Sequence, residues 1–175
     1  GYRRVNARFA AALVPHLRPD DLIWVHDYHL IPLATELRRL GVGNTIGFFL
    51  HIPFPTLEAL QAIPNHPELM RDLSHYDLVG FQAQRDVAAF AECVDHQAPT
   101  SLAGKPLKAA DFSHTIGRAF PIGTDPPAFA RLARGPAAGK MIKRMKATLG
   151  GQALVLGVDR LDYSKGLPQR VEAYE

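Results

Sequence analysis

The stretch at residues 22–55 reads LIWVHDYHLIPLATELRRLGVGNTIGFFLHIPFP, and it decides the expected fold. A short apolar run lies at its start, residues 22–25, and a second lies near its end, residues 45–50. Continuous apolar runs of this length are typical of strands buried on both faces of a parallel sheet. Between the two runs, apolar residues repeat with helical spacing at Leu30, Leu33, Ala34 and Leu37. The stretch therefore predicts a strand–helix–strand unit whose helix ends at Gly41.

The same alternation continues on both sides of this unit. Further strands are predicted at 78–81, 116–123 and 153–158. Apolar residues at helical spacing predict the helices that lie before, between and after them: Val5, Phe9, Leu13 and Leu17; Thr56 to Ile63; Asn65 to about His75; Val87, Phe90, Ala91 and Val94; Ile142, Met145 and Leu149; and a last helix from about Pro168. Strands that alternate with helices imply right-handed crossovers, so the predicted fold class is α/β, a Rossmann-like parallel sheet with helices on both faces.

A domain boundary is expected in the linker-like stretch TDPPAFARLARGPAAG, residues 124–139, where Asp125 and Pro126 read as an N-cap and first helical position. Residues 1–127 would form the C-terminal part of a first Rossmann-like domain. Residues 128–175 would supply the first strand, loop and helix of a second one. A loop is expected at 97–113. Because both ends of the chain fall inside helical patterns, we expect a fragment of a longer protein.

The overall composition limits the class of function. The chain has 20 basic and 17 acidic residues in 175, a net charge of +3 without a basic block, which disfavours a nucleic-acid partner. No apolar run approaches about 18 residues, so no membrane partner is expected. The single cysteine, Cys93, cannot form an internal disulfide, which favours a reducing, cytoplasmic location.

Polar clusters follow three of the predicted strands directly. They are HDYH at 26–29, HIPFP at 51–55 and DRLDYSKG at 159–166. Ligands of open parallel sheets bind beyond the carboxyl ends of the strands, which is where all three clusters lie. This shared position makes them the candidate binding and catalytic segments.

The third cluster suits a diphosphate. Arg160 offers a forked pair of donors and Lys165 a mobile point charge, and Gly166 lets the backbone approach a ligand closely just before a predicted helix. The alternative is that both basic side chains are simply solvated beside a capped helix. In either case, Asp162 would have a structural role: it would orient Arg160 or cap the turn.

The first two clusters hold His26, Asp27, His29 and His51, which raises the question of a metal. No metal site is expected, because the two histidines at 26–29 lie at a strand end and no Cys or clustered Glu supports them. Each histidine could instead hydrogen-bond the backbone. Asp27 could bind sugar hydroxyls or cap the helix that follows. His51 is held by Pro53 and Pro55, and a rigid imidazole suits a catalytic role, although a buried structural histidine fits the pattern as well.

Several enzyme classes lack their signature residues here. No G-x-S-x-G elbow supports a serine hydrolase, and no G-x-G-x-x-G follows the first strand as a dinucleotide-binding oxidoreductase would require. A glycoside hydrolase needs two carboxylates that flank the scissile bond, and only Asp27 is well placed.

Five segments resemble the trehalose-6-phosphate synthase family: DDLIWVHDYHLIPLATELRR, IGFFLHIPFPTLEAL, DLVGFQ, FPIG and VDRLDYSKGLPQRVEAYE. The resemblance implies a GT-B architecture of two Rossmann-like domains that face each other across a cleft. It implies a retaining glycosyltransferase that moves glucose from a nucleotide sugar, typically UDP-glucose, to glucose-6-phosphate, without a cofactor. In this reading Asp27 binds the acceptor, His51 is the catalytic histidine near the donor sugar, and Arg160 and Lys165 bind the donor diphosphate.

The family also carries acceptor-binding residues upstream and a nucleotide-binding acidic segment downstream of the matched segments. The 175-residue chain is therefore expected to be inactive alone. Two alternatives stay open: a related synthase with another acceptor, such as glycerol 3-phosphate, and a regulatory relative that binds sugar phosphates without turnover. A homo-oligomeric full-length protein is also left open.

Overall fold

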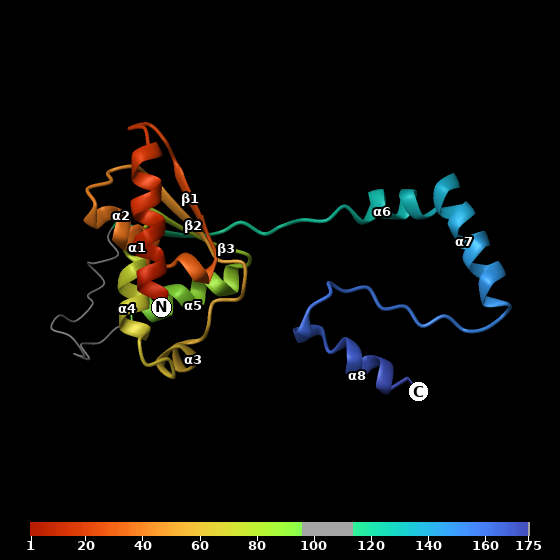
Figure 1. Cartoon of the computed structure of the whole chain (residues 1–175). Coiled ribbons are helices and arrows are strands. Elements are labelled where there is room, and N and C mark those ends of the chain that lie inside the picture. The colour runs from red at the N-terminus through yellow and green to blue at the C-terminus, as the bar shows by residue number, and fades with distance from the viewer. Residues whose placement is uncertain (96–113, 175) are drawn as a thin grey trace. The chain divides into compact units, whose positions relative to one another are not determined.

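The computed structural model describes residues 1–95 and 114–174 (Figure 1). The chain divides into two compact units, Gly1–Gly123 and Thr124–Glu175. Each unit is described by itself. The domain boundary expected after residue 127 stays a prediction, and the loop expected at 97–113 lies outside the described residues.

A four-stranded parallel sheet forms the centre of the first unit (Figure 1). Its strands are β1 (Ile23–His26), β2 (Ile46–Phe49), β3 (Leu78–Phe81) and β4 (Ile116–Ala119), in the order β1-β2-β3-β4. Four of the five predicted strands and their parallel pairing are confirmed. The fourth strand is shorter than expected, because Pro121 has no N–H to continue the ladder.

Helices α1 (Tyr2–Leu13), α2 (Leu33–Arg39), α3 (Leu57–Gln61), α4 (His66–Leu73) and α5 (Gln84–Asp95) belong to this unit, with single 3-10 turns at Val14–His16 and Tyr28–Leu30. Gly41 ends the α2 segment with a φ of 81°, as its position predicted. Thr56 caps α3 through the N–H of Ala59, whereas the Asn65 side chain makes no capping hydrogen bond to α4.

Only one face of the sheet is covered by helices among the described residues, so the expectation of two covered faces was wrong. The covered face carries the buried side chains Ile23, Val25, Ile46, Phe48, Val79 and Phe81. On the opposite face Trp24 is 68% exposed. The strand order never reverses, and right-handed crossovers that all advance in one direction place their helices on the same side of a sheet.

Helix α1 buries only part of the face that the sequence indicated, because Leu13 and the following Leu17 pack partly buried against the core but the earlier positions do not. Val5 and Phe9 are exposed, while Asn6 and Ala10 are completely buried. The turn after β1 lies against the buried side of α1, because the Asn6 amide donates to the carbonyl of His29. A specific polar contact thus overrides the apolar repeat in choosing which side of the helix faces the core.

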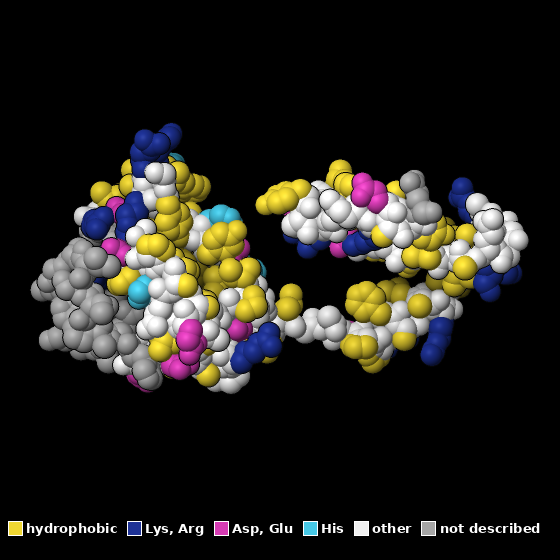
Figure 2. Space-filling view, turned by 90° about the horizontal axis from the view of Figure 1, so that it is seen from below, with side chains coloured by type: hydrophobic (Ala, Val, Ile, Leu, Met, Phe, Trp, Pro, Cys, Tyr) yellow, Lys and Arg dark blue, Asp and Glu magenta, His cyan; other side chains and the backbone are white. Residues whose placement is uncertain are grey.

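The second unit contains α6 (Pro126–Ala133), α7 (Pro136–Leu149), a 3-10 turn at Tyr163–Lys165 and α8 (Leu167–Glu172). Asp125 caps α6 as predicted, accepting a hydrogen bond from Ala128 N at 2.9 Å. The predicted strand at 153–158 is not formed, because no other strand lies in the described part of this unit for it to pair with. Apolar side chains of this unit consequently lie at its surface (Figure 2). No described helix of either unit has the length and apolar character needed to cross a membrane.

Candidate active-site edge of the sheet

The carboxyl ends of β1 and β2 bring two of the three predicted polar clusters together. The strands are in parallel register, with His26 beside Phe49, and Asp27 N donates to Phe49 O at 2.8 Å. The backbone N–H of His51 in turn donates to Asp27 Oδ1 at 3.4 Å. Asp27 and His51, which are 24 residues apart in the sequence, therefore meet at one edge of the sheet.

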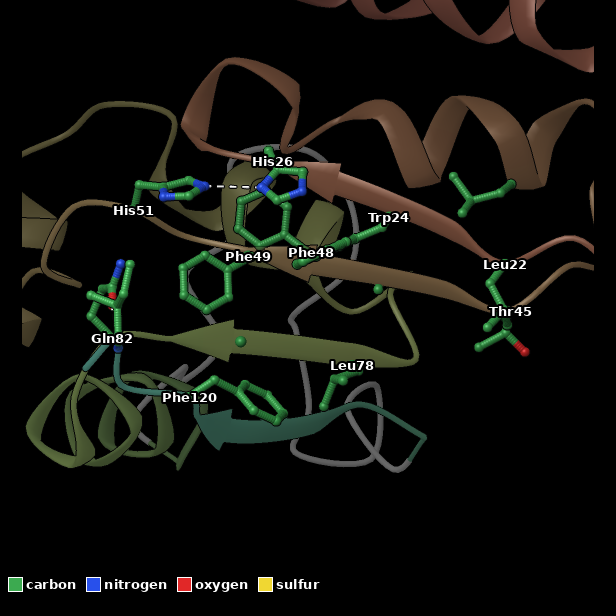
Figure 3. A pocket seen from close by; sticks show the side chains of 14 residues that line it. Leu22, Trp24, His26, Thr45, Phe48, Phe49, His51, Leu78, Gln82 and Phe120 are labelled. Atoms are coloured by element: carbon green, nitrogen blue, oxygen red, sulfur yellow. Dashed lines mark hydrogen bonds between the residues drawn. The ribbon is translucent and has the colours of Figure 1, made fainter. Parts of the chain in front are cut away.

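His26 contacts His51 directly, with 2.9 Å between His26 Nδ1 and His51 Nε2 (Figure 3). The pair is flanked by aromatic rings: Trp24 lies 4.4 Å from His26, and Phe49 lies 4.9 Å from His51, between ring centroids. One imidazole must donate and the other must accept, so each ring limits the tautomer of the other. The sequence interpretation offered His26 only a hydrogen bond to the backbone. The strand period of two, which puts Trp24 and His26 on one face, was the signal for this contact.

Asp27 has an unusual backbone conformation, with φ 69° and ψ 163°. It is the one non-glycine residue with positive φ in the part of the chain that the structure describes. This region is almost restricted to glycine and costs other residues about 1–3 kcal/mol, so the surrounding structure must hold Asp27 there. The alternative that its side chain caps the following turn is not realised, since no such hydrogen bond forms.

His29 does not take part in the contacts that join His26, Asp27 and His51. Its ring stacks on Tyr28 with 4.0 Å between centroids. Within residues 1–95 and 114–174, no group of three or more His, Cys, Asp or Glu side chains is arranged to hold a metal ion.

A cavity of about 840 Å³ lies over the uncovered face of the sheet (Figure 3). Its lining is mostly apolar, including Trp24, Phe49 and Phe120, with His26 and His51 where β1 and β2 end. Apolar walls offer no partners to sugar hydroxyls. The polar edge formed by His26, Asp27 and His51 is therefore the better candidate for a polar ligand than the floor of the cavity.

The third predicted cluster lies in the second unit, in the loop before α8. Asp162 accepts a hydrogen bond from Ser164 N at 2.9 Å, which lowers the pKa of its carboxyl group. Its other oxygen lies 3.8 Å from the Arg160 guanidinium, so Asp162 both caps the turn and pairs with Arg160. Gly166 adopts a φ of 58° between the turn and α8. Arg160 and Lys165 are both exposed, so their charged groups are accessible to an anion.

Arg170 is a residue of this loop that the sequence interpretation missed. It forms an ion pair with Asp159 at 2.7 Å, and a Cβ at Gly157 would lie only 2.9 Å from its Nη1. Arg170 thus ties α8 to the segment before Arg160. The available signal was the pair of opposite charges, Asp159 and Arg170, on either side of the DYSKG turn.

The parallel α/β sheet, with polar side chains gathered at the carboxyl ends of adjacent strands, defines a Rossmann-like α/β protein. The chain belongs to glycosyltransferase family 20, whose model matches residues 1–175.

Curated relatives match along the whole chain. It is 47% identical over 175 residues to trehalose-6-phosphate synthase of Sinorhizobium fredii and 47% identical over 175 residues to that of Citrobacter koseri. All of the chain is aligned in both cases, but it spans only 38% and 37% of these relatives.

Solved structures agree with this family membership. An Escherichia coli structure described as bound with UDP-2-fluoro glucose superposes with a TM-score of 0.74 at 44% identity, covering 99% of this chain and 38% of that one. A Burkholderia xenovorans α,α-trehalose-phosphate synthase (UDP-forming) in complex with glucose-6-phosphate gives a TM-score of 0.75 at 48% identity, with 99% and 39% covered. The predicted family and fold class are thereby confirmed.

Proposed function

We propose that this chain is part of a retaining, UDP-forming α,α-trehalose-phosphate synthase. The complete enzyme would transfer glucose from UDP-glucose to glucose-6-phosphate and release trehalose 6-phosphate and UDP. The observation that carries the proposal is the 47% identity to such synthases along all 175 residues. It is supported by related structures that are described with a UDP-glucose analogue and with glucose-6-phosphate.

We assign the acceptor to Asp27. A carboxylate accepts hydrogen bonds from sugar hydroxyls, and among the described residues the Asp27 side chain has one hydrogen bond, the long 3.4 Å contact with His51 N. Oδ2 is then available to the acceptor. The strained backbone supports this role, because such conformations persist mainly where function requires a side chain at a set position.

We assign His51 to the donor sugar. Its Nε2 faces His26, which leaves Nδ1 for a ligand. With Nε2 accepting from His26, Nδ1 carries the proton and can donate to a sugar oxygen. His51 is thus a catalytic donor of a hydrogen bond in this proposal, and not a metal ligand.

We assign the donor diphosphate to Arg160 and Lys165. Negative charge grows on the leaving diphosphate as the glycosidic bond breaks, and two cations there stabilise the transition state more than the ground state. The leaving phosphate oxygen would accept the proton of the attacking acceptor hydroxyl on the same face of the sugar. No pair of protein carboxylates is then needed, which suits a sheet edge with the single carboxylate Asp27.

Measurement of UDP release tests the proposal. The complete enzyme should release UDP from UDP-glucose only when glucose-6-phosphate is present, and NMR of the product should show an α,α linkage. If glucose is transferred to glycerol 3-phosphate but not to glucose-6-phosphate, the acceptor is glycerol 3-phosphate and the proposed acceptor is wrong. Ligand binding without turnover would replace the catalytic assignment by a regulatory one. The 175-residue chain alone should release no UDP, because it spans only about 38% of the relatives.

A further inference from the structure

The turn that follows Asp27 is held by side chains from outside it. The carbonyls of residues 28–31 each lie within hydrogen-bond distance of a distant side-chain donor, and the last two share the single proton of one hydroxyl. The Tyr2 hydroxyl donates to Tyr28 O, and the Asn6 amide donates to His29 O at 3.1 Å. The Tyr76 hydroxyl lies 2.8 Å from Leu30 O and 3.1 Å from Ile31 O. We call Tyr2, Asn6 and Tyr76 the turn clamp.

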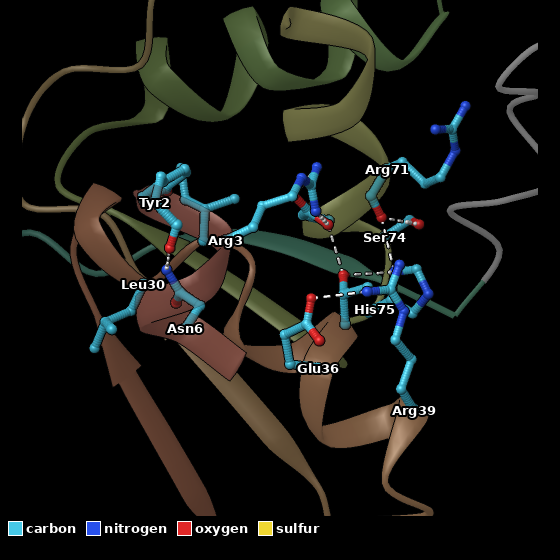
Figure 4. Close-up of polar contacts among 12 residues, drawn as sticks. Tyr2, Arg3, Asn6, Leu30, Glu36, Arg39, Arg71, Ser74 and His75 are labelled. Carbon is cyan, nitrogen blue, oxygen red and sulfur yellow. Dashed lines mark hydrogen bonds and ion pairs between the residues drawn. The ribbon is translucent and has the colours of Figure 1, made fainter. Parts of the chain in front are cut away.

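Two members of the turn clamp are buried inside the protein. Asn6 is 0% and Tyr76 is 1% exposed. The Tyr76 ring packs on Phe48 with 5.0 Å between centroids, and its hydroxyl pKa is raised by desolvation, so it stays a neutral donor. Asn6 also donates to Tyr2 O at 3.1 Å, which joins two members of the clamp (Figure 4).

The helix that carries Tyr2 and Asn6 is itself anchored by a buried carboxylate. Arg3 forms a two-pronged contact with Asp72, at 3.0 and 3.3 Å, and Asp72 also accepts from Thr35 Oγ1 at 2.7 Å (Figure 4). Asp72 lies on α4 and Thr35 on α2. This network fixes the start of α1 against both helices, and so fixes the clamp donors relative to the turn.

The turn clamp acts on the residue with the strained backbone. Asp27 O accepts from Leu30 N at 3.1 Å, so the strained residue and the clamped carbonyls belong to one hydrogen-bonded turn. A strained conformation relaxes unless its neighbours hold it. Without the clamp hydroxyls, the carbonyls of Leu30 and Ile31 would lose buried partners and the turn would be free to move.

We propose that Tyr76, together with Tyr2 and Asn6, positions the Asp27 carboxylate for the acceptor. These residues touch no substrate and act through the 28–31 turn. The inference rests on the proposed function for its kinetic consequence, but its structural consequence does not depend on any activity. The clamp acts first on the acceptor residue Asp27, and it reaches the donor-side residue His51 through the Asp27 contact with His51 N.

Tyr76→Phe in the complete enzyme is the first test, since it removes the hydroxyl and keeps the ring. KM for glucose-6-phosphate should rise about tenfold through the lost hydrogen bonds, while KM for UDP-glucose changes less than about twofold. Tyr174→Phe, the same change at a 73% exposed tyrosine, is the matched control and should alter neither value. Equal effects on both KM values, or none, would overturn the proposal.

Tyr2→Phe provides a second test that does not threaten the core, because Tyr2 is 42% exposed. It should shift acceptor KM in the same direction by a smaller factor, and it decides the question if Tyr76→Phe does not fold. A crystal structure of either variant gives a readout independent of activity. Asp27 should leave its positive φ and lose the contact with His51 N. An unchanged Asp27 backbone refutes the clamp, whereas an inactive wild-type enzyme with a relaxed Asp27 in the variant refutes only the proposed function.

Discussion

His26 Nδ1 lies 2.9 Å from His51 Nε2, at the ends of two adjacent strands. This contact makes His26 a positioning residue for the proposed catalytic histidine. It also fixes which nitrogen of His51 is left for a ligand. The proposed chemistry at this edge therefore depends on a residue that need not touch substrate.

His26→Phe should reduce kcat of the complete enzyme about tenfold, because the ring can still pack on Trp24 but no longer holds the His51 tautomer. Steady-state kinetics with both substrates measures this. The control is His16→Phe. His16 is an exposed histidine that precedes β1, and its substitution should leave kcat unchanged. A normal kcat in His26→Phe would show that His51 needs no partner.

Asp27→Gly should stabilise the first unit while it abolishes transfer to glucose-6-phosphate. Glycine adopts φ 69° without the penalty that Asp27 incurs, so the free energy of unfolding should rise by about 1 kcal/mol. Urea unfolding followed by Trp24 fluorescence reports on this unit, since Trp24 is the only tryptophan in the sequence. Asp20→Gly, at an exposed aspartate without positive φ, should instead lower stability slightly. A loss of stability in Asp27→Gly equal to that of the control would show that Asp27 is unstrained.

Lys165→Ala should raise KM for UDP-glucose and lower kcat, by a combined factor of about 100, because a cation at the leaving diphosphate is lost. KM for glucose-6-phosphate should stay unchanged. The comparison is Lys143→Ala, which removes an exposed lysine of α7 and should have no kinetic effect. If both variants behave alike, the basic loop is merely a solvated surface and the diphosphate lies elsewhere.

Cys93 should resist alkylation in the folded chain. Burial raises the pKa of its thiol to about 11, so little thiolate is present at pH 8. Iodoacetamide labelling followed by mass spectrometry should be about 100-fold slower in buffer than in urea.

The same thiol makes the stability of the fold depend on pH. Because the pKa of Cys93 is higher in the folded than in the unfolded chain, its burial supports stability below about pH 9, and this contribution is lost as the pH rises toward 11. Tyr2, whose pKa is raised to about 12 mainly by desolvation, adds to the loss at still higher pH. Rapid iodoacetamide labelling of Cys93 in the native chain would contradict its burial.

The sequence was sufficient to predict those residues of the candidate site that directly follow a strand, because parallel strands run in the same direction. HDYH and HIPFP follow apolar runs, and parallel strands end at a common edge, so Asp27 and His51 had to be near each other. The clamp residue Tyr76 could not be found in this way. Its ring reads as an ordinary core aromatic, and its hydroxyl meets a turn 45 residues earlier only after α4 has packed.

Covering of the sheet was predicted wrongly for a comparable reason. Apolar runs such as LIWV indicate strands that can be buried on both faces, but they do not indicate which helices are present to bury them. The strand order decides that, and within residues 1–95 and 114–123 it places the crossover helices on the side of Val25 and leaves Trp24 uncovered. Similarly, the run at 153–158 has strand character, but the described part of its unit offers it no strand to pair with.

The sequence by itself determined the α/β alternation of the first unit, the caps at Asp125 and Gly41, and the two polar clusters at the ends of β1 and β2. These depend on local periodicity and backbone preferences, which act over a few residues. Only the tertiary structure decided the buried side of α1, the strain at Asp27 and the pairing of His26 with His51. Those features arise from hydrogen bonds and packing between residues 23 or more positions apart, whose partners no local pattern specifies.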